Sequence, residues 1–167
     1  IEITYVFKPY KNTSTMETLN IGILNKLSGL LFFLKRSNNE FEMVADEIEN
    51  YSLKTALNGL SEESSFYAGE LKDYLNHLGI NTPFIQYDRL NDTEYGNTSE
   101  QLTNSNGNEL NTICTYNEMY LTDAYSDLLK ESLPFESLKE IILYQLNALK
   151  YSFLKIKTLN TARFAVY

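Results

Sequence analysis

The stretch from Ser52 to Gly79 constrains the fold of this chain more than any other segment. Mostly apolar residues recur in it at steps of three and four, which is the spacing of one face of an α-helix. These residues are Leu53, Leu57, Leu60, Ser64, Tyr67, Leu71, Tyr74 and Leu78. Gly79, with Pro83 shortly beyond it, marks the end of the pattern. A helix of this length would extend roughly 40 Å, which is typical of a helical bundle.

Three other segments have a matching length and period, so the sequence predicts four long helices. We expect them at about 15–49, 52–79, 108–132 and 134–160. Ser14 or Thr15 would cap the first helix, and Pro134 would occupy the first position of the last one. Because so few residues separate the first two helices, they should be antiparallel neighbours.

Residues 80–107 have a different character, being rich in Asn, Thr, Ser and Gly and lacking a helical period. Fully extended, they could span about 95 Å, more than the length of the bundle. They are either a mobile linker or the long crossover of a ferritin-like bundle, and we favour the crossover. The second and third helices would then run parallel. The predicted fold is one all-α domain over residues 1–167, a ferritin-like up-down four-helix bundle with a long crossover between helices two and three.

Composition excludes several classes of protein. A formal charge of −8 argues against nucleic acid as a partner, because a phosphate backbone attracts basic surfaces. A single cysteine permits neither an internal disulfide nor a cysteine-based zinc site, which fits a reducing, cytoplasmic location. No run reaches the ~18 apolar residues that a membrane span needs. The chain begins at Ile1 without a methionine, which leaves open a preceding N-terminal segment such as a signal.

Four polar residues interrupt the apolar faces near the middle of the predicted helices. They are Asn38, Ser64, Asn117 and Gln145. Four carboxylates flank the same region, where ferritin-like bundles place a metal pair. They are Glu42, Glu63, Glu70 and Glu118. We favour a hydrogen-bonded layer that fixes the register of the helices, in which the four side chains satisfy one another or a buried water. The alternatives are a weak carboxylate metal site and a small-ligand cavity.

The residues available for metal binding or catalysis are few. A di-iron site of the ferritin type needs two Glu-x-x-His motifs, and this chain has none. Its one histidine, His77, lies beside the end of the second helix, where a histidine usually complements the helix dipole. Cys114 lies on an apolar face with no histidine placed to activate it. We therefore expect no metal, no cofactor and no catalytic residue.

Several segments resemble a known family. LNKL at 24–27, ADEIEN at 45–50, SLKTALNGL at 52–60 and FYAGELKDYLNHLG at 66–79 are similar to uncharacterised bacterial ferritin-like proteins. In the second half Glu118, Ala124-Tyr125, LLKESLP and Gln145 extend the resemblance. The resemblance implies a four-helix bundle with a long central connection and no established activity. This chain departs from the family in a more polar crossover, and in Ser152 or Phe153 standing where a histidine is common.

These observations favour a non-enzymatic binding or structural module. The alternative is a ferritin-like carboxylate metal-binding protein, in iron handling or a stress response. The chain holds 13 tyrosines and 9 phenylalanines, more than one inward face per helix can bury. We therefore expect an aromatic strip over the third and fourth helices, formed by Tyr116, Tyr120, Tyr144 and Tyr151. Such a strip suits a homodimer, or an unknown protein partner.

Overall fold

The computed structural model describes residues 19–80 and 108–162. Four long α-helices make up most of this part of the chain, and it contains no strand. They are α2 (Ile21–Glu47), α3 (Tyr51–His77), α6 (Asn108–Leu129) and α7 (Glu136–Ala162). The prediction of an all-α chain with four helices is therefore confirmed for the described residues.

The helix starts differ from those predicted. Asn20 has an extended backbone, so the first helix cannot run through it from residue 15. Its side chain instead caps α2 by accepting a hydrogen bond from the backbone N–H of Ile23 at 2.9 Å. Asn50 caps α3 in the same way through the N–H of Leu53, so that helix begins at Tyr51. The predicted caps Ser14 and Thr15 lie outside the described residues.

The last helix also begins later than predicted. Pro134 is not its first residue, because the carbonyl of Phe135 accepts the opening hydrogen bonds from Leu138 and Lys139. Pro134 therefore precedes the residue that caps α7. The apolar period identified each helix but not its terminal turn, where packing on the core is weakest.

The predicted stop at the end of α3 is confirmed. Gly79 has a φ of 76°, a left-handed conformation that residues with a Cβ adopt only at a cost. The N–H of Gly79 bonds to the carbonyl of Asn76, and the N–H of Ile80 bonds to that of Leu75. These two bonds form a Schellman motif, with Ile80 and Leu75 both buried in the core beneath it.

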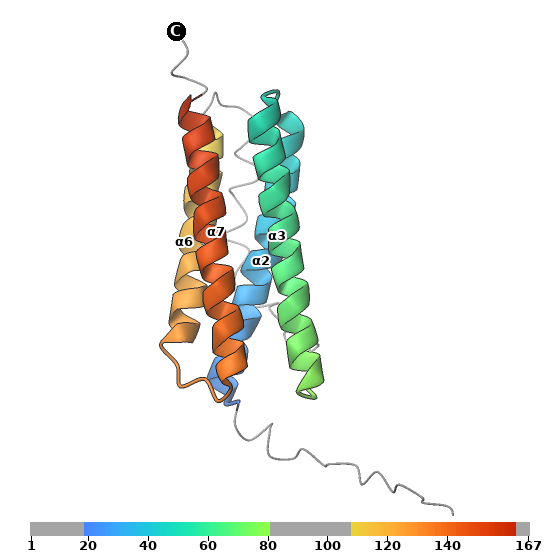
Figure 1. Cartoon of the computed structure of the whole chain (residues 1–167), viewed down its shortest axis with the longest axis vertical. Coiled ribbons are helices and arrows are strands. Elements are labelled where there is room, and N and C mark those ends of the chain that lie inside the picture. The colour runs from blue at the N-terminus through green and yellow to red at the C-terminus, as the bar shows by residue number, and fades with distance from the viewer. Residues whose placement is uncertain (1–18, 81–107, 163–167) are drawn as a thin grey trace, which may run out of the picture.

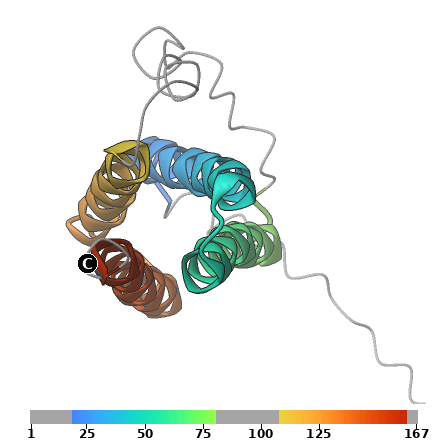
Figure 2. The same cartoon turned by 90° about the horizontal axis from the view of Figure 1, so that it is seen from above.

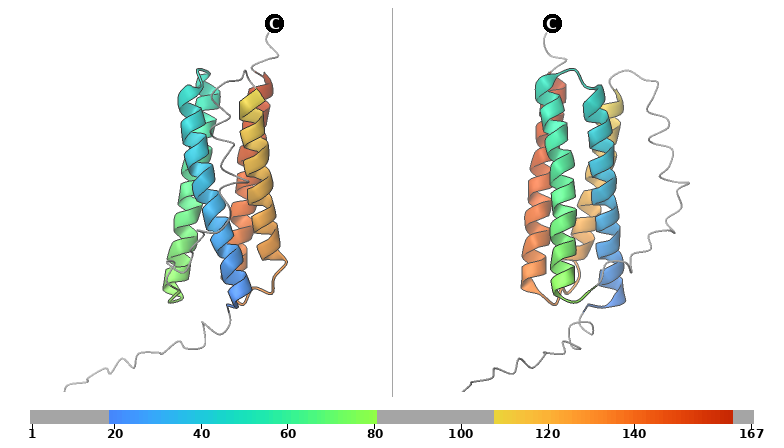
Figure 3. Two further views of the ribbon diagram at one scale, coloured as in Figure 1. Left: turned by 180° about the vertical axis from the view of Figure 1, so that it is seen from behind. Right: turned by 90° about the vertical axis from the view of Figure 1, so that its right-hand side faces the viewer.

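The four helices pack side by side around one core, in the ring order α2, α3, α7, α6 (Figure 2). A short turn joins α2 to α3 at one end, so these helices are antiparallel neighbours as expected (Figure 3). The helices α3 and α6 lie on a diagonal of the ring and run in the same direction (Figure 1). The end of α3 and the start of α6 therefore lie at opposite ends of the bundle. The predicted crossover that would join them lies outside the described residues, apart from Ile80.

The core is built mainly from leucines contributed by all four helices, as the periodicity predicted. The largest fully buried side chains are Tyr125, Phe41 and Phe153. Phe41 of α2 and Phe153 of α7 meet edge to face, with ring centroids 5.8 Å apart. Because α2 and α7 are diagonal partners, this contact fills the centre of the bundle. No helix in the described segments is long and apolar enough to cross a membrane.

Candidate functional site

Besides the Lys54–Asp46 ion pair, two neighbouring pairs of side chains make polar contacts between α2 and α3. The Ser64 hydroxyl lies 3.3 Å from that of Ser37, and both residues are fully buried. The Asn38 amide donates to the carbonyl and the hydroxyl oxygen of Ser61, at 3.0 and 2.9 Å. The Ser61 hydroxyl in turn donates to the Asn38 carbonyl. Ser37, and not the predicted Asn38, occupies the inward position of α2.

Asn117 has different partners, on the opposite side of α2. Its side-chain amide donates to the Glu40 carboxylate at 2.6 Å and to the Ile113 carbonyl at 3.0 Å. Arg36 binds the other oxygen of Glu40 at 2.6 Å, so this carboxylate joins α2 to α6. The buried amide of Asn117 is thus paired with a charged acceptor, which makes a strong hydrogen bond.

Gln145 lies at the centre of a network that joins three helices. The hydroxyl of Tyr125 on α6 donates to Gln145 Oε1 at 2.8 Å, and Gln145 Nε2 donates to Glu70 of α3 at 2.8 Å. Gln145 and Tyr125 are both fully buried. Burial is the largest cause that raises the pKa of Tyr125, which therefore stays a neutral donor. The network holds α6, α7 and α3 in one register.

Glu63 of α3 is held by hydrogen bonds from its own helix and from α7. The hydroxyl of Tyr67 donates to one of its oxygens at 2.7 Å, and that of Ser152 on α7 donates to the other at 2.6 Å. Burial, and then the bond to Glu63, raise the pKa of Tyr67. Both oxygens of this carboxylate are therefore engaged by neutral hydroxyls of its own chain.

The eight residues singled out in the sequence do not form one site. Among the described residues, Asn38, Ser64, Asn117 and Gln145 make no direct hydrogen bond to one another and bind other side chains instead. Three of them, excluding Asn38, are buried as predicted. The helices carry them to different interfaces, because equal height does not fix which neighbour a side chain faces. Glu118 pairs with Lys157, and Glu42 is exposed beside Asn38.

These carboxylates do not fit a metal pair. The oxygens of Glu63 and one oxygen of Glu70 accept hydrogen bonds from uncharged donors, and no imidazole lies among them. His77 is the last residue of α3, with Nδ1 2.6 Å from the Asp73 carbonyl. In the described segments no group of three or more His, Cys, Asp or Glu side chains is arranged to hold a metal ion.

Cys114 is equally unsuited to nucleophilic chemistry. The residue is buried, and burial raises the pKa of its thiol to about 12, so that it carries its proton at neutral pH. It lies in the first part of α6, whereas His77 ends α3 at the other end of the bundle (Figure 1). The histidine is therefore too far from the sulfur to activate it.

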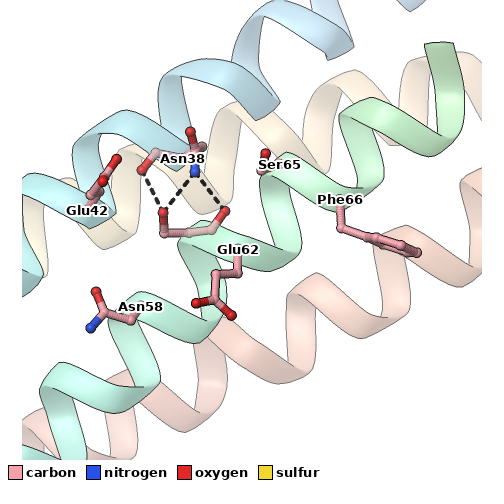
Figure 4. A pocket seen from close by; sticks show the side chains of 7 residues that line it. Asn38, Glu42, Asn58, Glu62, Ser65 and Phe66 are labelled. Atoms are coloured by element: carbon pink, nitrogen blue, oxygen red, sulfur yellow. Dashed lines mark hydrogen bonds between the residues drawn. The ribbon is translucent and has the colours of Figure 1, made fainter.

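An open pocket of about 440 Å³ lies on the outside of the bundle between α2 and α3. Asn38 and Glu42 of α2 lie on one side of it, opposite four labelled residues of α3 (Figure 4). These are Asn58, Glu62, Ser65 and Phe66, and Ser61 completes the lining. The Asn38–Ser61 hydrogen bonds cross between the two helices and hold this part of the pocket in place (Figure 4).

The α3 side of this pocket was missed in the sequence. A signal was present, since Asn58, Ser61, Glu62 and Ser65 recur at steps of three and four beside the apolar face. Such a polar row is indistinguishable from an ordinary solvated face until the neighbouring helix is known. The exposed Phe66 beside it was the less common feature, with 65% of its surface accessible.

Three of the four tyrosines expected to form one strip lie on two sides of the bundle, and the fourth, Tyr151, is exposed on α7. Tyr120 stacks on Phe33 of α2, with centroids 5.3 Å apart, and Tyr116 stacks on Tyr120. Tyr144 packs instead against Tyr67 of α3. Because the α2–α6 and α3–α7 interfaces lie on opposite sides of the bundle (Figure 2), these contacts do not form the predicted strip over α6 and α7. Self-association itself stays a prediction, which light scattering across a dilution series would test.

The fold and these contacts define the class of the protein as an all-α four-helix bundle. Buried polar side chains are hydrogen-bonded to one another inside the bundle, and an open pocket lies on its outside between α2 and α3. Comparison with protein-family models, with curated proteins and with solved structures gives no match for this chain.

Proposed function

We propose that this protein is a non-enzymatic binding module that uses the outer pocket between α2 and α3 to hold a ligand group. One contrast carries the proposal. Inside the bundle the polar side chains bind one another, with Asn160 Oδ1 as the buried side-chain atom lacking a partner among the described residues. In the pocket, the side chains of Glu42, Asn58, Glu62 and Ser65 make no hydrogen bond or ion pair within the described part of the chain.

The size and lining of the pocket support binding rather than catalysis. A volume of about 440 Å³ falls within the range of sites that hold small molecules or single side chains. Its lining offers carboxylate, amide and hydroxyl groups with one aromatic ring, and includes no cysteine or histidine. These groups recognise a ligand by charge, hydrogen bonding and stacking.

We also propose that the bundle is ferritin-like, with residues 80–107 as its crossover. The directions of the helices support this, because each helix is antiparallel to both of its neighbours and parallel to its diagonal partner (Figure 1). A connection from the end of α3 to the start of α6 must travel the length of the bundle. An experimental structure in which residues 81–107 remain at one end would refute this proposal.

Titration of ¹⁵N-labelled protein tests the binding function. The probes are capped lysine, glutamate and phenylalanine tripeptides and glucose, each followed by amide chemical shifts. At least one probe should produce saturable shifts confined to the residues that line the pocket, and should itself stay chemically unchanged. Probes that all leave those signals unmoved would overturn the proposal.

A matched pair of variants controls for indirect effects. Ser65→Tyr places a ring in the pocket from an exposed position and should abolish the shifts. Thr55→Tyr adds the same ring on an exposed position of α3 that does not line the pocket, and should preserve them. Equal binding by both variants would place the ligand elsewhere.

A further inference from the structure

We infer that the pocket between α2 and α3 accepts a cationic side chain, lysine or arginine, presented by another protein. This inference rests on the proposed binding function and adds the chemistry of the ligand. It follows from the unpaired charge in the pocket, the ring beside it and the size of the space.

The charge of the pocket is the first argument. Glu42 and Glu62 both line it, and within the described residues neither forms an ion pair. Other carboxylates on the described surface differ in this respect, since Asp127, Glu118 and Glu131 have a lysine partner whereas Glu47 and Glu140 have none. Two free carboxylates on a chain of net charge −8 attract a cation and repel an anion.

The aromatic ring is the second argument. Phe66 lies at one side of the pocket with most of its surface exposed. Lysine and arginine combine an apolar stem with a charged head, so the stem can pack on the ring while the head meets the carboxylates. Asn58 and Ser65 supply further oxygens that can accept hydrogen bonds from an ammonium or guanidinium group.

The shape of the pocket is the third argument. Its α3 lining, from Asn58 to Phe66, covers eight residue steps, or about 12 Å along the helix axis. That length suits one long side chain with its local backbone and is too short for an extended peptide. The hydrogen bonds between Asn38 and Ser61 tie α2 to α3 within the lining, so this part of the site is already held in place.

The test compares three peptides that differ at one position, acetyl-Gly-X-Gly-amide with X as lysine, norleucine or glutamate. Norleucine keeps the apolar stem and lacks the charge. The lysine peptide should shift the amide signals of Asn38, Asn58 and Ser65 and saturate, and 0.5 M salt should weaken its binding. The norleucine and glutamate peptides should bind about 10-fold more weakly, as expected for the loss of two exposed ion pairs.

Substitutions of the two pocket glutamates test the same interaction from the side of the protein. The double variant Glu42→Gln with Glu62→Gln should bind the lysine peptide about 10-fold more weakly and lose the salt dependence. The control, Glu47→Gln with Glu140→Gln, removes two exposed charges that do not line the pocket and should stay within about 3-fold of the parent. All four glutamates are exposed, and circular dichroism verifies that each variant is folded.

The outcomes separate this inference from the function on which it rests. Equal binding of the lysine and norleucine peptides, or equal binding by both double variants, would overturn the cationic ligand. Glucose or the phenylalanine peptide binding at the pocket in place of lysine would overturn it as well, while leaving the binding function intact. If no probe binds there, both proposals fail together.

Discussion

The side-chain amide of Gln145 donates a 2.8 Å hydrogen bond to the carboxylate of Glu70, 75 residues away on α3. Gln145→Leu would remove this bond and leave the buried hydroxyl of Tyr125 without its acceptor. We expect the free energy of unfolding to fall by about 2–3 kcal/mol, the cost of leaving such groups unpaired. Urea denaturation at pH 7 measures the change. Asn147→Leu, at an exposed position on the same helix, should stay within about 0.5 kcal/mol of the parent, and a similar value for both variants would contradict the role of the network.

Cys114 should make the protein sensitive to alkaline pH. Burial raises the pKa of its thiol from 9.0 to about 12, so between these values the unfolded chain releases a proton that the folded chain keeps. This contribution to stability is complete below pH 9 and is lost at about 1.4 kcal/mol per pH unit above it. Tyr67 and Tyr125, whose pKa values are also raised, add losses of the same sign at higher pH.

Denaturation curves from pH 8 to pH 11 for the parent and for Cys114→Ala test this prediction. The variant lacks the thiol, so its stability should fall less steeply above pH 9. Parallel curves for the two proteins would show that the thiol titrates alike in the folded and unfolded chains.

Substitution by alanine should raise the stability of the protein at two glycines within α3 and lower it at the glycine that follows this helix. Gly59 and Gly69 are helical, and a Cβ at either position meets open space. Alanine there should stabilise the protein by up to about 1 kcal/mol each, because glycine is the poorer helix former. Gly79→Ala should destabilise it by about 1 kcal/mol, since alanine must adopt a left-handed conformation. Thermal unfolding measures all three, and a stabilising Gly79→Ala would contradict the Schellman ending of α3.

The purified protein should contain no stoichiometric iron or zinc and should show no ferroxidase activity. The reason is the donor set, because Tyr67 and Ser152 occupy the oxygens of Glu63 that a metal would need. Elemental analysis of protein prepared without chelator measures the metal content. A metal pair present in each chain and lost in Glu63→Ala would instead support the carboxylate metal-binding alternative.

The sequence predicted the long helices well, because burial repeats along each of them with a strict period. Ser64 and Gln145 interrupt apolar faces, and both are buried as that period requires. The period gives the rotation of a residue about its own helix axis and says nothing of which neighbour it will face. For that reason the height of Gln145 was predicted, whereas its partners Tyr125 and Glu70 were not.

The candidate pocket was harder to predict for the same reason. Glu42 was singled out as a flanking carboxylate, but the pocket that it lines together with Glu62 arises only where α2 and α3 meet. Asn38 was placed on the inward face, whereas the adjacent Ser37 is the buried residue. A shift of one residue rotates a side chain by about 100°, which is enough to move it from the core to the rim of a groove.

The short turn between α2 and α3 has a consequence for the kinetics of folding. Only residues 48–50 separate these helices, so their contacts can form with little loss of chain entropy. Bonds such as Glu63–Ser152 join residues 89 positions apart and require a much larger loop to close. We therefore expect the α2–α3 hairpin to form early, and docking of α7 onto α3 to limit the rate. Substitutions at Ser61 should then slow folding, whereas substitutions at Ser152 should mainly accelerate unfolding.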